Sequence, residues 1–150
     1  LNEKKYKMGF IASGDHNGMG IGVAALWVKE LTREGVLEAM RSNRCFATTG
    51  DKMIIDFRID GHPTGSTIQT NNTPKLELNV KAQHELAKVE ILRNSQVIKE
   101  FDIKGKVLDF NGIYEDNNYQ DEKDGLYYYI RITQQNAEIG WSSPIWIENS

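Results

Sequence analysis

The chain has 150 residues, of which 26% are charged and 39% hydrophobic, a composition typical of a globular domain that excludes fibrous and disordered proteins. Its net charge of −3 is spread along the sequence, so nothing predicts a nucleic-acid partner. No apolar run reaches the roughly 20 residues that a membrane-spanning helix needs, and we expect no membrane partner.

The first residues, Leu1 to Lys7, lack the apolar core of a signal peptide and an initiator methionine. We therefore expect the chain to come from a longer protein. Its localisation stays unknown at this stage, because an upstream signal would not be visible. A single cysteine, Cys45, excludes an intrachain disulfide without defining the compartment.

Residues 1–50 have the pattern of an α/β segment. Met8–Ser13 is expected to be a short buried strand, and the apolar run at residues 22–28 a second one. Residues 45–49 are expected to be extended, ending at Gly50. The sequence therefore predicts a structural boundary near residue 50.

A helix is expected between these apolar runs. Thr32 is a candidate N-cap, and Glu34 lies in the first turn, where a carboxylate suits the helix dipole. The apolar face is expected to consist of Val36, Leu37 and Met40, with Arg41 and Arg44 near the C-terminal end.

From about Lys52 onward, hydrophobic and polar residues alternate, which is typical of half-buried antiparallel strands. The expected strands are residues 55–59, 76–82, 87–91, 96–101, 126–133 and 143–148. Asn94-Ser95 is a candidate tight turn, and residues 111–125, rich in Asp, Asn and Gly, are expected to form a long loop. Six or seven strands without a helix predict an immunoglobulin-like sandwich at residues 51–150.

Asp15 and His16 are the candidate metal ligands of the chain. Carboxylate oxygen and neutral imidazole are usual ligands of divalent metals, and the combination suits Zn, Mn or Fe. Neighbouring residues of an extended strand point to opposite faces, so both side chains can face one metal only if the backbone turns, which Gly14 and Gly18 allow. The alternative is a solvated turn in which Asp15 caps a backbone amide.

Other chemically active residues have plainer interpretations. Cys45 is expected to be a small hydrophobe in a packed strand, and His62 and His84 to lie on the surface. The acidic residues between Glu115 and Asp124 lack the ordered spacing of a calcium loop and are expected to be solvated. We expect the aromatic residues near the end of the chain to pack inside the protein; they are Tyr127, Tyr128, Tyr129, Trp141 and Trp146.

Five stretches together resemble the end of the catalytic domain in a prokaryotic family related to the PHP (polymerase and histidinol phosphatase) metal-dependent phosphoesterases. They are Gly-Phe-Ile-Ala-Ser-Gly-Asp-His at 9–16, Leu-Thr-Arg-Glu-Gly-Val-Leu-Glu-Ala-Met-Arg at 31–41, Arg-Cys-Phe-Ala-Thr-Thr-Gly at 44–50, Ile-Asp-Phe-Arg-Ile-Asp-Gly at 55–61 and Trp-Ser-Ser-Pro-Ile-Trp-Ile at 141–147. The last stretch is similar to the family's closing segment. The resemblance implies that residues 1–50 are the C-terminal remnant of a PHP-type barrel.

The barrel of PHP enzymes ends with a strand that carries an Asp-x-His metal motif, whereas Asp15 and His16 are adjacent here. The resemblance implies either that both bind a metal or that only His16 binds while Asp15 orients it. The other PHP ligands, which begin with a His-x-His, are absent from this chain. Catalytic zinc usually needs three protein ligands and an open position for water. We therefore expect no catalytic residues and no bound metal in this fragment alone.

The predicted fold class is α+β, a small remnant of a PHP-type barrel (1–50) followed by an antiparallel immunoglobulin-like sandwich (51–150). The predicted function is that of a non-catalytic fragment of a PHP-like phosphoester hydrolase, with the rest of the barrel as its partner and a divalent metal in the intact protein. A glycan- or protein-binding module and a purely structural domain are the alternatives. The bare sheet edge of the remnant must fold against the sandwich, pair in a homodimer or stay partly disordered.

Overall fold

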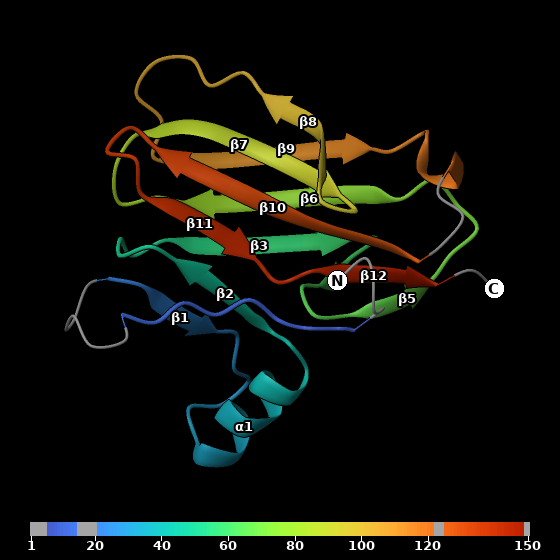
Figure 1. Ribbon diagram of the computed structural model, residues 1–150, viewed down its shortest axis with the longest axis horizontal. Helices are drawn as coiled ribbons and strands as arrows, with labels where there is room; N and C mark the ends of the chain where they lie inside the picture. Colours follow the sequence, from blue (N-terminus) through green and yellow to red (C-terminus); the bar gives the residue numbers. More distant parts are fainter. Residues whose placement is uncertain (1–5, 15–20, 122–124, 149–150) are drawn as a thin grey trace.

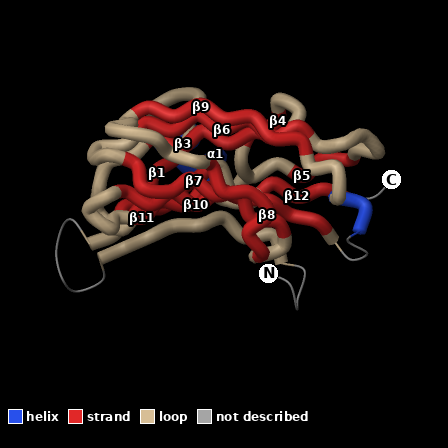
Figure 2. Tube along the Cα trace, turned by 90° about the horizontal axis from the view of Figure 1, so that it is seen from above, coloured by secondary structure: helices blue, strands red, loops and turns tan. Residues whose placement is uncertain are grey.

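The computed structural model describes residues 6–14, 21–121 and 125–148. Two β-sheets, whose strands are mostly antiparallel, pack face to face as a β-sandwich (Figure 1). Seen from above, the sheets form two layers (Figure 2). The fold is therefore the β-sandwich that the alternating pattern predicts, and a nine-residue helix projects from its lower side in Figure 1.

Within the described residues, we distinguish a large sheet of eight strands and a small sheet of four. The large sheet contains β1 (Val23–Leu26), β2 (Cys45–Thr48), β5 (Thr67–Gln69), β7 (Leu86–Arg93), β8 (Gln96–Phe101), β10 (Leu126–Gln134), β11 (Ile139–Ser142) and β12 (Ile145–Glu148). The small sheet contains β3 (Ile54–Ile59), β4 (His62–Pro63), β6 (Lys75–Lys81) and β9 (Asp109–Glu115). The helix α1 spans Arg33–Arg41, and a 3₁₀ turn, η1, spans Tyr119–Asp121.

The small sheet follows the predicted alternation closely. Three pairs of apolar residues lie opposite each other on β3 and β6: Ile55 and Val80, Phe57 and Leu78, and Ile59 and Leu76. All six are buried in the core between the sheets. Because side chains alternate along a strand, Asp56 and Arg58 of β3 point to the outer face. The period-two prediction for this part of the chain is confirmed.

The large sheet is organised around β10. One edge of β10 pairs with β7, and the other edge pairs with β11 and then with β12. Tyr128, Ile130 and Ile132 of β10 are fully buried. The turn between β7 and β8 is the predicted Asn94-Ser95 pair, whose φ angles of 47° and 67° suit a hairpin with two left-handed residues.

The strands β1 and β2 belong to the large sheet. β2 pairs with β1 on one side and with β11 on the other, so the N-terminal segment folds against the sandwich. β1 and β2 run antiparallel, whereas the strands of an α/β barrel run parallel. Residues 23–48 therefore do not show a barrel unit, and a PHP-type remnant and a boundary at residue 50 both stay predictions.

Helix α1 begins where the sequence predicts. The Oγ1 of the N-cap residue Thr32 accepts a hydrogen bond from the Gly35 amide (3.0 Å), and Asn43 takes a left-handed φ of 53° just after the helix. The predicted apolar face is only partly correct, because the side chains of Leu37 and Met40 are exposed. None of the helices in the described ranges is long and apolar enough to cross a membrane.

The long loop predicted at residues 111–125 is wrong in its first part. β9 continues to Glu115 and pairs with β6 along seven residues. Phe110, Gly112 and Tyr114 turn toward the core, while Asn111 and Ile113 between them occupy the outer face. The described residues after Gly50 form ten strands rather than six or seven, because β4, β5 and β11, with two to four residues, are too short for a readable period, and β9 lies in the stretch expected to be a loop.

Candidate functional site

Residues 6–14, which lead to Asp15 and His16, form a segment that we call the N-terminal strap. The strap is not part of either sheet, so the strand predicted at Met8–Ser13 is wrong. Its backbone amides are bound by side chains instead of by a neighbouring strand. The Gly9 amide donates to Asn43 Oδ1 (3.0 Å), and the Phe10 amide donates to Ser143 Oγ (2.7 Å).

The strap fits tightly on the large sheet. A Cβ atom at Gly9 would lie 2.7 Å from Cys45 Sγ, closer than such contacts allow. The ring of Phe10 packs edge-on against Tyr129 with 5.2 Å between ring centroids, and Lys7 forms an ion pair with Glu148. The sandwich therefore holds the backbone a few residues before Asp15.

Asp15 and His16 themselves lie outside the described residues. Among the described residues, no group of three or more His, Cys, Asp and Glu side chains is arranged to hold a metal ion.

Cys45 is buried at the start of β2, which confirms the prediction of a packed strand. Its Sγ lies 3.1 Å from the hydroxyl of Ser143, whose oxygen also accepts the Phe10 amide. Cys45 therefore packs beneath the strap and is not accessible as a nucleophile.

The other two histidines differ from each other. His62 is exposed at the start of β4, after the Asp60-Gly61 turn, as predicted. His84 has an exposed side chain but belongs to a hydrogen-bonded cluster around Asp51. Asp51 Oδ2 lies 2.7 Å from His84 Nδ1 and accepts hydrogen bonds from the amide groups of Gln134 (2.6 Å) and Asn136 (2.8 Å). This cluster ties three loops together.

The aromatic residues near the end of the chain are packed, as predicted. Tyr127, Tyr128 and Trp146 are buried, and Tyr129 and Trp141 are half-buried. These five residues therefore do not form the exposed aromatic row on which a glycan could stack.

The acidic stretch contains a buried residue that the sequence analysis missed. Asp116 is 1% exposed, and its Oδ2 accepts hydrogen bonds from Arg93 Nη1 and from the hydroxyl of Tyr128, both at 2.8 Å. Burial, followed by the neighbouring carboxylate, raises the pKa of Tyr128 far above its usual value. Asp116 therefore links the end of β9 to β7 and β10 instead of facing solvent.

A second charged pair lies across β7 and β10. Glu90 is 5% exposed and accepts two hydrogen bonds from Arg131, from Nε (2.7 Å) and Nη2 (3.0 Å). The hydrogen bonds from Arg131 lower the pKa of Glu90, although partial burial acts in the opposite direction. The bidentate geometry makes this a stronger pair than exposed surface ion pairs.

This pair predicts a pH-dependent contribution to stability. Because the pKa of Glu90 is lower in the folded state than in the unfolded chain, its contribution is present above the unfolded pKa and is lost as pH falls through the folded pKa. In urea unfolding, the difference in stability between wild type and Glu90→Gln should be constant above about pH 6 and shrink below about pH 5. Glu100→Gln, at an exposed position of neighbouring β8, is the control. A difference that does not change with pH would contradict the assignment.

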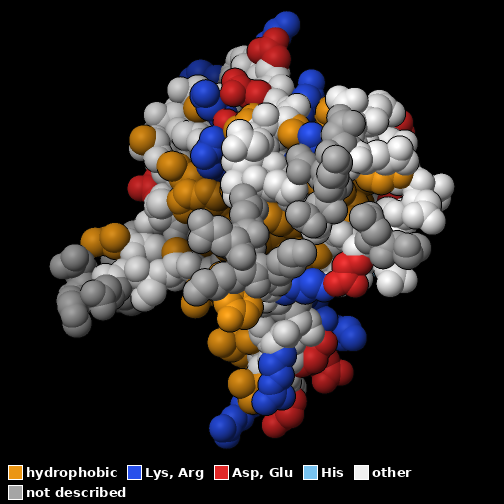
Figure 3. Space-filling view, turned by 45° about the vertical axis from the view of Figure 1, so that its right-hand side comes forward, with side chains coloured by type: hydrophobic (Ala, Val, Ile, Leu, Met, Phe, Trp, Pro, Cys, Tyr) orange, Lys and Arg blue, Asp and Glu red, His pale blue; other side chains and the backbone are white. Residues whose placement is uncertain are grey.

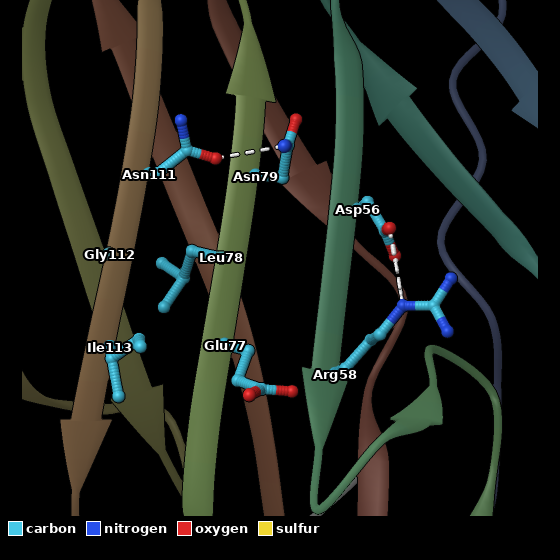
Figure 4. A pocket seen from close by; sticks show the side chains of 8 residues that line it. All are labelled: Asp56, Arg58, Glu77, Leu78, Asn79, Asn111, Gly112 and Ile113. Atoms are coloured by element: carbon cyan, nitrogen blue, oxygen red, sulfur yellow. Dashed lines mark hydrogen bonds and ion pairs between the residues drawn. The ribbon is translucent and has the colours of Figure 1, made fainter.

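The outer face of the small sheet carries a shallow groove between β3, β6 and β9 (Figure 4). The side chains of Asp56 and Arg58 bind each other on one side (3.0 Å), and those of Asn79 and Asn111 do so on the other (2.8 Å). Most of the accessible lining of the groove is apolar, and the polar side chains of these two pairs already hydrogen-bond to each other. It holds no aromatic side chain and no ligand set for a metal.

Comparison with known proteins identifies similar sequences. The profile of a family described as proteins of unknown function (DUF3604) matches residues 2–59. This match covers the N-terminal strap, β1, α1, β2 and β3, and it includes Asp15 and His16.

Curated relatives align over almost the whole chain. An uncharacterized protein of Chlamydia pneumoniae is 30% identical over 97% of this chain, and one of Chlamydia trachomatis is 29% identical over the same share. The chain spans 28% of the length of these relatives. The structure of a lytic polysaccharide monooxygenase from Jonesia denitrificans shares 17% identity, with a TM-score of 0.40 over 59% of each chain, a similarity too low to assign the fold.

The DUF3604 match and the sandwich overlap in β1, β2 and β3. The matched residues run from the strap through the first strand of the small sheet. β2, within the match, pairs with β11, which lies far outside it. The matched segment is therefore structurally continuous with the sandwich.

Proposed function

We propose that this chain is an accessory β-sandwich, immunoglobulin-like in type, of a longer metal-dependent phosphoester hydrolase related to the PHP enzymes. In this proposal the chain is not catalytic by itself and contributes Asp15 and His16 to the edge of a metal site. The resemblance of residues 9–16 to the end of a PHP barrel supports the proposal, as does the greater length of the curated relatives.

The observation that carries the proposal is that hydrogen bonds and an ion pair hold the strap against the sandwich. Gly9 and Phe10 are hydrogen-bonded to side chains next to β2 and β12, and Lys7 is paired with Glu148. Metal ligands need a supporting framework that holds them to within a fraction of an ångström of their positions. The sandwich holds the backbone at Gly9 and Phe10, a few residues before the Asp15-His16 pair, which supports such a framework.

The donor set of the pair fits a divalent metal. Asp15 supplies a carboxylate and His16 an imidazole, and Zn, Mn and Fe accept both. Either both side chains bind the metal, or His16 binds while Asp15 orients its ring. A metal bound there would lower the pKa of a water molecule for attack on a phosphorus centre. The remaining ligands would come from the preceding part of the longer protein.

A comparison of two protein lengths tests this proposal. The full-length protein is expected to contain a stoichiometric divalent metal and to hydrolyse chromogenic phosphate esters, whereas the 150-residue chain should do neither. Metal content is measured by elemental analysis after removal of loosely bound ions. Activity or stoichiometric metal in the 150-residue chain would contradict the proposal, as would a metal-free full-length protein that cannot be loaded.

The alternative of a glycan-binding module receives less support. Stacking on sugars needs exposed aromatic faces. Of the residues that could have formed such a face, Tyr127, Tyr128 and Trp146 are buried, and Tyr129 and Trp141 are half-buried. Light scattering of the isolated chain tests whether it forms a homodimer. The activity of the full-length protein tests the purely structural role.

A further inference from the structure

Helix α1 is too short and too exposed to be stable on its own contacts. It has nine residues, and isolated helices shorter than about 12–15 residues are marginal in water. Of its side chains, only that of Ala39 is buried. Most of the stability of a protein helix comes from packing of an apolar face. The described residues provide α1 with little of this packing.

The face of α1 that points away from the sandwich is also apolar. At about 100° per residue, Leu37 and Met40 lie opposite Gly35 and the buried Ala39. Leu37 is 39% exposed, Met40 is 53% exposed, and Leu31, just before the helix, is 89% exposed. We call these three residues the α1 patch.

Exposed apolar residues are concentrated near this part of the chain. Of the twelve large hydrophobic residues exposed among those described, eight lie between residues 6 and 40, and four are scattered between residues 54 and 113. Single exposed apolar residues are normal, whereas neighbouring ones such as Leu37 and Met40, about one helical turn apart, can form an interaction surface. In Figure 3, apolar side chains gather where α1 protrudes, next to basic and acidic groups.

We propose that the α1 patch docks on the part of the same polypeptide that precedes residue 1 in the longer protein. The inference rests on the proposed function, which places this chain after a preceding region of a longer polypeptide. The chain spans 28% of the length of its curated relatives, so such a region has ample length to cover the patch. The exposed Arg33 and Arg41 flank the apolar residues. Glu34 and Glu38 of the helix are exposed as well, so the matching surface of the preceding region is expected to be apolar, with charges of both signs at its edge.

A tethered partner fits this surface better than a second copy of the chain. A stable interface buries about 800 Å² on each partner. A nine-residue helix is only about 14 Å long and cannot bury that area by itself. A region joined to the same polypeptide is present at an effective concentration in the millimolar range, so a small interface is sufficient.

Hydrogen exchange of the α1 amides tests the docking. The amides of residues 36–41 should exchange at least about tenfold more slowly in the full-length protein than in the 150-residue chain. In the full-length protein, the double substitution Leu37→Asp, Met40→Asp should remove this extra protection. Ile113→Asp, at an exposed position of β9, is the matched control and should leave α1 protected.

Equal protection of α1 in the two proteins would overturn the inference. Protection in the 150-residue chain that increases with its concentration would also overturn it, because a second copy would then cover the patch. Metal content is measured in the same full-length samples. A full-length protein that protects α1 but binds no metal would support the docking while contradicting the proposed metal site, so the two failures are distinguishable.

Discussion

Replacing Asp116 with alanine is expected to lower the free energy of unfolding by about 3–5 kcal/mol. The Asp116 side chain is 2% exposed and that of Arg93 is 14% exposed, so the substitution breaks a largely buried, hydrogen-bonded charge pair. It also removes the acceptor of the buried Tyr128 hydroxyl. Breaking a buried charge pair by removing one partner is among the most destabilising single changes.

The neighbouring residue provides a matched control for Asp116. Glu115 is adjacent in sequence but exposed, so Glu115→Ala should change stability by less than about 0.5 kcal/mol. Tyr128→Phe removes a single hydrogen bond to Asp116 and should cost an intermediate amount, about 1–2 kcal/mol. Chemical unfolding followed by circular dichroism measures all three. Equal effects of Asp116→Ala and Glu115→Ala would show that the buried link does not stabilise the fold.

The second large effect is expected at Gly9 in the strap. A Cβ atom there would lie 2.7 Å from Cys45 Sγ and 3.1 Å from both Asn43 Oδ1 and Ser143 Oγ. Gly9→Ala should therefore lower the free energy of unfolding by about 1–3 kcal/mol, because the strap must move away from the side chains that it contacts. Lifting would stretch the hydrogen bonds from the amides of Gly9 and Phe10.

A double-mutant cycle separates this clash from other effects of the alanine. Cys45→Ala removes the sulfur atom that the new Cβ would contact. In the Cys45→Ala background, Gly9→Ala should cost less than half of what it costs in the wild type. Unfolding free energies of the four proteins measure the coupling. If the changes in unfolding free energy of the two substitutions are strictly additive, the strap does not pack against Cys45.

The sequence predicts the strands that have a long apolar period and misses those that do not. The alternation in β3 and β6 is readable because each strand presents three apolar residues to the core. The sequence pattern does not reveal β9, because Asp109 and Asn111 face outward and Gly112 carries no side chain. The pairing of β2 with β11 joins residues more than 90 positions apart, and no local pattern specifies such a contact.

The candidate site is less predictable than the strands. The buried Asp116 lies in a stretch of acidic residues that has the composition of a solvated loop, and only the fold brings Arg93 and Tyr128 to it. Periodicity identified Leu37 and Met40 as an apolar face but could not show whether the sandwich or another surface covers that face. Asp15 and His16 were singled out by residue chemistry and by resemblance to a family, and they lie outside the described residues.

The most direct test is the metal content of the full-length protein with Asp15→Ala and His16→Ala combined. The double variant is expected to lose its divalent metal while its circular dichroism spectrum and unfolding midpoint stay close to those of the wild type. His62→Ala, at the exposed start of β4, is the control and should keep the metal. A double variant that retains the full metal content would contradict the account.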